Sequence, residues 1–275
     1  MFTPSKDLLV KDWKQDVIYL VQFPRTHVIP SPSPFVMKLE TWIRMNGLTY
    51  RNVSNELSKG SVKGQIPFIE LNGRQFADTN LIIEHLRNHF KLSIDSTLNN
   101  LERAHLRAYT VLLEESIFRC GQYYRSIEFE WFFTEEGVMS HTNGLKKFLI
   151  KTFGPKILQK TLKNIVNVQG YGRHSYDEVD EIAKKDLIAI STLLGDKPFL
   201  FGSTPSTLDA ILFGFMAQFT ETPTSPAIMP FIEKSAPNLL SFVQLIKKRY
   251  WPDWNEIIEN LILNPDDFDE KNKQK

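Results

Sequence analysis

The 275-residue chain has a single cysteine, Cys120, and no run of 18 or more uncharged apolar residues. One cysteine excludes an internal disulfide and a C-x-x-C metal or redox pair, and it fits a reducing compartment in which Cys120 is a small buried hydrophobe. The missing apolar run excludes a membrane-spanning helix. Five charged residues within positions 1–15 exclude a secretion signal, which needs an apolar stretch there. We therefore expect a cytoplasmic protein.

Glycine and proline are also scarce, at 13 and 15 residues, and neither sign of charge dominates, since the net charge is +1. These counts exclude a collagen-like or low-complexity chain, and 42% hydrophobic residues are enough for a packed core. A nucleic-acid-binding protein usually carries a strongly basic domain, so no nucleic-acid partner is expected. The length favours two domains.

The first half of the chain alternates strand and helix signals. Ser33-Pro34 predicts a helix start, because serine is a good N-cap and proline suits the first helical position. Asn72-Gly73 predicts a type I′ hairpin turn, because both residues tolerate positive φ angles. A crossover followed by a hairpin requires a mixed sheet covered by helices, as in the thioredoxin topology. The expected elements are a strand (16–23), a helix from Ser33-Pro34 to Gly47, a strand (48–53), a hairpin (65–77) and a helix capped by Asp78-Thr79.

The second half contains only helical signals. Ser175 and Glu178 form a capping box, and the helix opening at Ser206 is apolar almost all round, which predicts that it is the centre of the domain. The fold class is therefore an α/β domain followed by an all-α domain. The expected organisation is an N-terminal extension (1–15), a thioredoxin-like domain (16–90), a polar linker (91–100), a helical domain (101–262) and a polar tail (263–275).

Several motifs occur in one order: Ser33-Pro34 after the first strand, Ile66-Pro67 before the hairpin, Asp78-Thr79 at a helix start and Leu208-Asp209 in the helical half. Together they resemble the two-domain glutathione transferase fold. Within that superfamily the chain resembles the failed axon connections family, which is related to metaxins and to nematode cadmium-responsive proteins. This narrower resemblance is carried by QFPRT (22–26), SPSPF (31–35), KLETW (38–42), GYGR (170–173) and KRYWPDW (248–254).

The resemblance implies that the chain binds glutathione, as a ligand or co-substrate rather than a resident cofactor. A cis Ile66-Pro67 bond would direct the backbone of Ile66 at the peptide, which binds like an added strand. Thr79, at a helix N-terminus, can meet the γ-glutamyl carboxylate, and Asp78 can accept from the amino group. The alternative is that Asp78 and Thr79 only cap their helix and that Pro67 only shapes a turn.

Ser33 stands where related omega-class transferases and glutaredoxins have a reactive cysteine. Without a thiolate, mixed-disulfide chemistry is not available. A serine hydroxyl can still donate to the glutathione thiolate, and one such bond is worth about 1.5–3 kcal/mol, or one to two pKa units. Ser33 is therefore the candidate catalytic residue, the alternative being a plain N-cap. Arg25, in the same loop, is a further candidate for glutathione binding, and Ser31 and Thr26 are reserve candidates there.

A basic segment runs from residue 137 to residue 176, where seven Lys and Arg residues and no Asp or Glu occur in 40 residues. Apolar residues interleave with them, so a helix here has an apolar and a basic side. One interpretation is attraction to an acidic membrane surface or an acidic partner. The other is a solvated face whose apolar side belongs to the bundle core.

The sequence thus predicts a cytosolic glutathione transferase-like protein that binds glutathione and conjugates electrophiles in stress or detoxification. The alternative is a non-catalytic adaptor on the same fold, acting in axonal development or as a metaxin-like interaction protein. The resemblance permits a homodimer. His85 and His89 have helical i, i+4 spacing, but no further ligand completes a zinc site, so no metal is expected.

Overall fold

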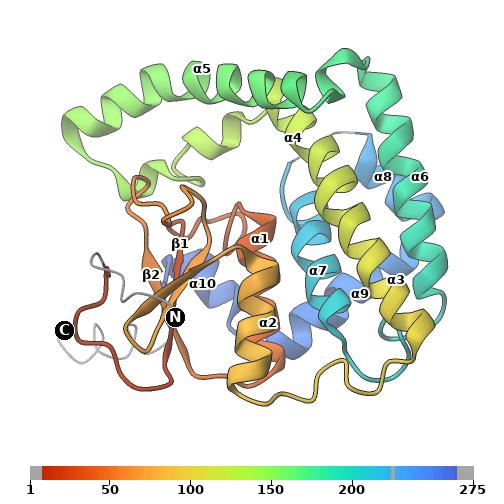
Figure 1. The fold of residues 1–275 in the computed structure, drawn as a ribbon. Helices are drawn as coiled ribbons and strands as arrows, with labels where there is room; N and C mark the ends of the chain where they lie inside the picture. Colours follow the sequence, from red (N-terminus) through yellow and green to blue (C-terminus); the bar gives the residue numbers. More distant parts are fainter. Residues whose placement is uncertain (1–7, 224–226, 265–275) are drawn as a thin grey trace.

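The computed structural model describes residues 8–223 and 227–264. The first half folds around a four-stranded sheet in the order β2-β1-β3-β4 (Figure 1). β1 pairs parallel with β2, across the α1 crossover, and antiparallel with β3. Asn72 and Gly73 turn the β3-β4 hairpin with φ angles of 50° and 75°, as predicted. The elements of this half are β1 (Ile18–Gln22), α1 (Pro34–Met45), β2 (Tyr50–Ser54), β3 (Phe68–Leu71), β4 (Arg74–Ala77) and α2 (Thr79–His89).

The second half is helical, which confirms the predicted fold class. Ser175 and Glu178 form the expected capping box of α6, and every residue of α7 from Thr207 to Phe219 is buried, so α7 is the central helix. The last helix, α10, was not predicted. The elements are α3 (Asn100–Val111), the π-helical turn η1 (Leu112–Ile117), α4 (Phe118–Ile127), the 3₁₀ turns η2 (Glu130–Phe133), η3 (Met139–His141) and η4 (Tyr171–Arg173), α5 (Gly144–Val168), α6 (Tyr176–Leu194), α7 (Thr207–Thr220), α8 (Ile228–Ser235), α9 (Pro237–Tyr250) and α10 (Trp254–Asn260).

The two halves meet where α1 packs against α7. Gly214 of α7 faces the backbone of α1 so closely that a Cβ atom there would lie 2.5 Å from the backbone nitrogen of Lys38 and 2.7 Å from the backbone oxygen of Pro34. Only glycine allows this approach, because any side chain would overlap the α1 backbone. This contact fixes the start of α1, including Ser33, relative to the helical half.

Helix α5 lies across the top of the molecule in Figure 1, above both halves. It has 25 residues, and only Val166 among them is buried. The interpretation that its apolar side belongs to the bundle core is therefore wrong for most of its length. The helix packs on α4, η2 and η4 and leaves large apolar residues in solvent.

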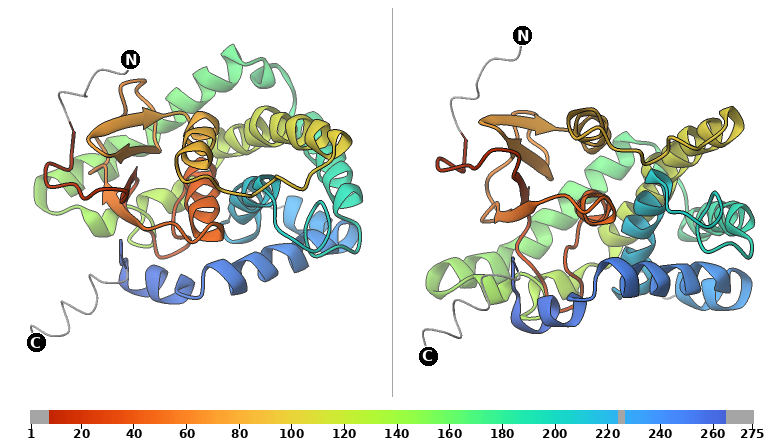
Figure 2. Two further views of the ribbon diagram at one scale, coloured as in Figure 1. Left: turned by 60° about the horizontal axis from the view of Figure 1, so that its bottom comes forward. Right: turned by 90° about the horizontal axis from the view of Figure 1, so that it is seen from below.

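The end of the described chain returns to the sheet. Helices α9 and α10 run along the molecule from the helical half to the sheet (Figure 2), and the Asn264 side chain then exchanges two hydrogen bonds with the backbone of Asn52 in β2. Residues 263 and 264 were expected to begin a polar tail. That expectation is wrong for these two residues, because Asn264 is buried. The rest of the predicted tail and residues 1–7 lie outside the described residues.

Candidate functional site

A cleft of about 900 Å³ lies between the sheet half and the helical half. Its polar side is built by three segments of the first half: the start of α1, the loop before β3 and the start of α2. Its apolar side is built by η2 and α5, whereas α4 adds Phe118 together with the polar side chains of Arg119, Gln122 and Arg125. Five of the six residues predicted for the glutathione site line this cleft together, namely Ser33, Ile66, Pro67, Asp78 and Thr79.

Ser33 is the N-cap of α1. Its hydroxyl oxygen accepts a long hydrogen bond, 3.4 Å, from the backbone N–H of Val36. Among the described residues the hydroxyl proton has no acceptor, so it is available to a ligand in the cleft. Capping and ligand binding are therefore compatible at Ser33.

The Ile66-Pro67 peptide bond is cis, as the resemblance implied. Ile66 precedes β3, so its N–H and C=O lie outside the hydrogen-bonded ladder of the sheet. These groups are placed beside the cleft, where a peptide could use them.

Asp78 and Thr79 open α2. One carboxylate oxygen of Asp78 accepts from the backbone N–H groups of Asn80 and Leu81, so Asp78 does cap the helix. Its backbone has φ 77° and ψ 116°, a conformation that a residue with a side chain rarely adopts. Strain of this kind persists where the surrounding structure enforces it, often at binding sites. Asp78, Thr79 and Asn80, the residues at this start of α2, all line the cleft.

A buried ammonium group behind Thr79 was not predicted. Lys38 Nζ of α1 donates to Thr79 Oγ1 at 2.9 Å and to the carboxylate of Glu114 at 2.5 Å. Burial lowers the pKa of Lys38, and the Glu114 carboxylate opposes that change. Because Lys38 occupies a lone pair of the Thr79 oxygen, the Thr79 hydroxyl proton points elsewhere and can donate to a carboxylate.

Glu114 reaches Lys38 from the π-helical turn η1, which interrupts the run from α3 to α4. A π-turn of this kind is frequent at functional sites, because it redirects side chains that a regular helix would place differently. No local sequence signal marks it. The only trace of Lys38 in the sequence was its presence in the KLETW motif.

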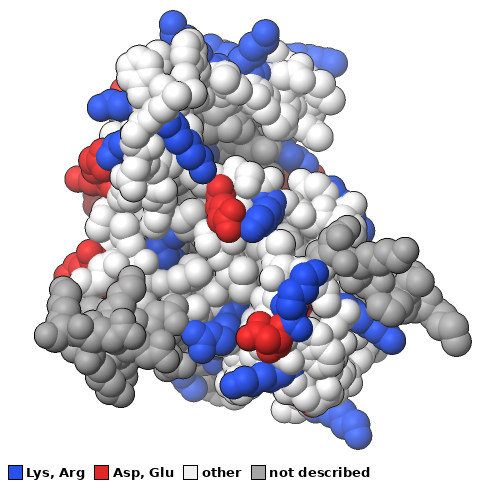
Figure 3. All heavy atoms as spheres, turned by 90° about the vertical axis from the view of Figure 1, so that its left-hand side faces the viewer, with Lys and Arg blue, Asp and Glu red and all other residues white. Residues whose placement is uncertain are grey.

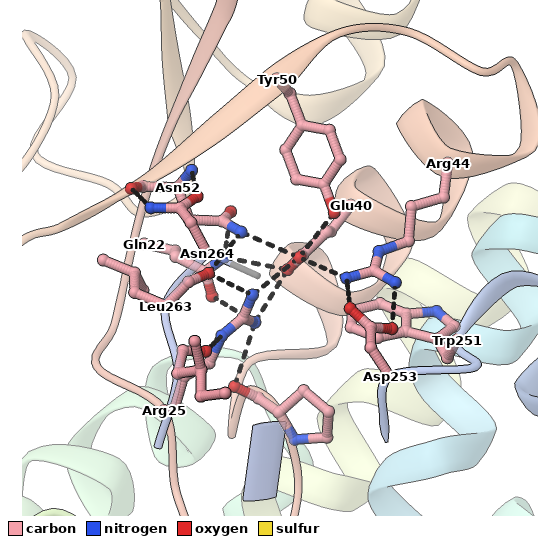
Figure 4. A network of polar contacts seen from close by, with 12 residues as sticks. Gln22, Arg25, Glu40, Arg44, Tyr50, Asn52, Trp251, Asp253, Leu263 and Asn264 are labelled. Carbon is pink, nitrogen blue, oxygen red and sulfur yellow. Dashed lines mark hydrogen bonds and ion pairs between the residues drawn. The ribbon is translucent and has the colours of Figure 1, made fainter. Parts of the chain in front are cut away.

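Arg25 lies away from the cleft, so the prediction that it binds glutathione is wrong. Its guanidinium is 1% exposed and makes two hydrogen bonds, of 2.8 and 2.9 Å, to the fully buried carboxylate of Glu40 (Figure 4). It also donates to the backbone oxygens of Ile262 and Leu263, near the end of the described chain. Glu40 accepts in addition from Gln22, Arg44, Tyr50 and Asn52. Arg25 is thus a structural residue that joins the first loop, α1 and the C-terminal segment.

The remaining candidates have structural surroundings. Cys120 is fully buried within α4, which confirms the expected buried hydrophobe, and burial raises the pKa of its thiol to about 12. His85 stacks on Phe76, and His89 Nε2 lies 2.8 Å from Asp16. Within residues 8–223 and 227–264 no cluster of three or more His, Cys, Asp or Glu side chains could hold a metal ion. No helix of this described part is long and apolar enough to cross a membrane.

A thioredoxin-like sheet joined through α1 and α7 to a helical domain, with a cleft between them, defines the class of glutathione transferase-fold proteins. Family profiles agree: the glutathione S-transferase N-terminal domain matches residues 34–131, and the glutathione S-transferase C-terminal domain matches residues 183–246. Among solved structures, the β-etherase LigF from Sphingobium sp. strain SYK-6 has a TM-score of 0.59 at 15% identity, covering 84% of this chain and 95% of that one. A Methylobacterium radiotolerans glutathione S-transferase in complex with glutathione sulfonate has a TM-score of 0.53 at 13% identity, covering 85% and 91%.

The chain belongs to the glutathione S-transferase superfamily, and it is similar to failed axon connections and to the metaxins. It is 36% identical to failed axon connections of Drosophila melanogaster over 263 residues, which is 92% of this chain but 62% of the Drosophila protein. It is 27% identical to an isoprene-epoxide glutathione S-transferase of Rhodococcus over 81% of this chain and 94% of that protein. It is 21% identical to mouse metaxin-2 over 92% and 95% of the two chains.

Proposed function

We propose that the chain binds glutathione in this cleft and conjugates it to small apolar electrophiles. The observation that carries the proposal is that Ser33 and Thr79, each at the start of a different helix, present hydroxyl groups to one cleft whose opposite wall is apolar.

The polar side of the cleft suits the peptide. A carboxylate at the N-terminus of α2 would meet the Thr79 hydroxyl and the positive end of the helix dipole, while the carboxylate of Asp78 favours an ammonium group nearby. Ser33 would donate a hydrogen bond to the thiolate sulfur and thereby lower the pKa of the glutathione thiol.

The apolar side suits a hydrophobic second substrate. Phenylalanines at and near η2 and aliphatic residues of α5 pack together into one apolar wall, which carries no charge of its own. The Rhodococcus relative is named for isoprene epoxide, a small electrophile of this character. The residues of the apolar wall are Phe129, Phe132, Phe133, Ile157, Leu158 and Leu162.

Replacing Thr79 with valine should weaken glutathione binding about 10- to 100-fold, because one hydrogen bond to a charged group is worth about 1.5–3 kcal/mol. Isothermal titration calorimetry of the full chain with reduced glutathione measures this change. Thr192→Val is the matched control, since Thr192 lies on the exposed side of α6 and its hydroxyl donates to the Ile188 oxygen of its own helix. Wild-type protein that gives no binding heat and ignores a glutathione resin would overturn the proposal.

Replacing Ser33 with alanine should leave binding in place and slow the conjugation of chlorodinitrobenzene about 10- to 100-fold near neutral pH, because the bound thiol would titrate one to two units higher. Equal turnover by wild type and Ser33→Ala would show that Ser33 is only an N-cap. Glutathione binding by the wild type without turnover of any electrophile would support the second candidate, a non-catalytic adaptor, which the missing cysteine at position 33 favours.

The proposal also covers the cellular location, the biological role and the oligomeric state. A glutathione-dependent protein with one inert cysteine fits the cytoplasm, where glutathione is abundant, and a role in stress or detoxification. A homodimer is the proposed assembly, and size-exclusion chromatography with light scattering tests it.

A further inference from the structure

Helix α5 has two different faces. One face lines the cleft with residues spaced three or four apart, including Ile150, Leu158 and Leu162. The opposite face looks outward. At its beginning it carries four large apolar side chains that are 45–73% exposed, namely Leu145, Phe148, Leu149 and Phe153. Single exposed apolar residues are ordinary, but a group on consecutive turns of one helix marks an interaction surface.

The same outward face is basic over its second half. Lys156, Lys160 and Lys163 are exposed and follow the i, i+4, i+7 spacing that places them on one side of the helix. None of the three makes an ion pair with a described residue. Figure 3 shows Lys and Arg side chains along the upper end of the molecule, where α5 lies. The helix as a whole has six lysines and no acidic residue.

Exposed apolar and basic side chains on one helix face favour one class of binding partner. A second copy of the chain seated on α5 would bring the two lysine rows together, and like charges repel. A bilayer with anionic headgroups offers negative charge to the lysines and hydrocarbon to the leucines and phenylalanines, and the long lysine side chains can reach the headgroups while the apolar residues insert. Because no described helix can cross a membrane, α5 would lie on the surface of the bilayer.

We propose that the outward face of α5 is a docking surface for membranes rich in anionic phospholipid. Leu145, Phe148, Leu149 and Phe153 insert at the headgroup boundary, and Lys156, Lys160 and Lys163 hold the lipid headgroups. The opposite face of the same helix lines the cleft, so docking brings the cleft to the membrane surface, where apolar molecules concentrate. The proposal does not depend on glutathione binding.

The test is co-sedimentation of the full chain with vesicles of phosphatidylcholine, alone or with about 30 mol% phosphatidylserine. We expect binding only to the anionic vesicles and a loss of binding as salt rises from roughly 0.1 M to 0.5 M. The triple variant Lys156→Gln, Lys160→Gln, Lys163→Gln should reduce the partition coefficient about 100-fold, since each lysine contributes about 1 kcal/mol. The matched control replaces three exposed lysines elsewhere, Lys185, Lys234 and Lys248, with glutamine and should stay within about twofold of wild type.

The double variant Phe148→Ser, Leu149→Ser should also reduce binding, by about tenfold or more, because it removes apolar area that would enter the bilayer. Circular dichroism should show that both α5 variants fold, since the replaced side chains are exposed. Failure of the wild type to bind anionic vesicles at low salt would overturn the proposal, as would equal losses in the lysine variant and its control. Stronger binding to polyglutamate than to vesicles would overturn it in favour of an acidic protein partner.

Discussion

Replacing Arg25 with methionine should lower the free energy of unfolding by about 3–5 kcal/mol, because it leaves the Glu40 carboxylate buried without its main partner. Arg25 is 1% exposed and Glu40 is fully buried, so water cannot replace the lost guanidinium. The substitution also removes donors to the backbone oxygens of Pro30, Ile262 and Leu263. A buried charge that loses its main partner is among the most destabilising changes that one substitution can make, even though Arg44 still lies 3.4 Å from Glu40.

Urea unfolding of wild type and variant measures this loss. Lys59→Met is the control, because its partner Glu56 is exposed and such surface pairs contribute about 0–1 kcal/mol. Arg25→Lys keeps the positive charge but not the bidentate hydrogen bonding to Glu40, so it should lower the free energy of unfolding by less than Arg25→Met does. It also keeps the prediction testable if Arg25→Met does not fold. A loss below about 1 kcal/mol for Arg25→Met would contradict the assignment. Unchanged glutathione affinity in the folded Arg25→Lys variant would confirm that Arg25 lies outside the site.

The contribution of this network to the free energy of unfolding depends on pH. Burial alone would raise the pKa of Glu40, but Arg25, with help from Arg44 and Gln22, outweighs burial and lowers it from 4.5 to about 2. The charged form is therefore favoured in the folded state. Its stabilisation, about 3 kcal/mol, is complete above the unfolded pKa and is lost as pH falls from 4.5 toward 2. The stability difference between wild type and Arg25→Met should accordingly narrow over that range.

Replacing Gly214 with alanine should cost about 3 kcal/mol or more, at or beyond the upper end of overpacking effects. The new Cβ would overlap the α1 backbone, because it would lie 2.8 Å from the Cα atom and 2.5 Å from the backbone nitrogen of Lys38. A backbone segment inside a helix cannot move aside as a flexible side chain can, so α1 and α7 must separate. Ser33 and Lys38 would shift with α1, and glutathione affinity should fall together with the melting temperature.

Gly121→Ala is the matched control for Gly214→Ala. Gly121 also lies within a helix, α4, but its nearest neighbour would be the Phe219 ring at an ordinary 3.6 Å. Alanine is the better helix former, so this variant should be neutral or more stable by up to about 1 kcal/mol. Equal melting temperatures for the two variants would show that the α1-α7 contact is looser than the structure indicates.

Features encoded by adjacent residues could be predicted from the sequence. Ser33-Pro34 and the Ser175 capping box place helix starts through bonds that span three residues, and Asn72-Gly73 sets a turn by its own backbone preferences. The order of these signals then limits the topology to a mixed sheet followed by helices. The cleft residues followed from their resemblance to glutathione transferases, and the structure brings five of them together.

Features that depend on distant partners could not be predicted. Nothing near Arg25 in the sequence indicates that it is buried, because the residues that accept its hydrogen bonds, Glu40 and Leu263, lie 15 and 238 positions away. Lys38 pairs with Glu114 across 76 positions, and the helical spacing of α1 gives no reason to expect a buried ammonium. In α5 the apolar pattern was read correctly as helical, but periodicity cannot tell whether an apolar face meets a core, a cleft or solvent.

The pairing of Asn264 with Asn52 bears on how the sheet avoids self-association. β2 is an edge strand, and an edge strand offers unpaired backbone groups to the strands of neighbouring molecules. The side-chain amide of Asn264 accepts from the backbone N–H of Asn52 at 2.6 Å and donates to its backbone C=O at 3.0 Å. It thereby makes the same pair of hydrogen bonds that a residue of a further strand would make. A chain shortened to end at residue 262 would leave the backbone N–H and C=O of Asn52 unpaired and would also remove the Leu263 oxygen that accepts from Arg25. Its characteristic defect would be edge-to-edge aggregation.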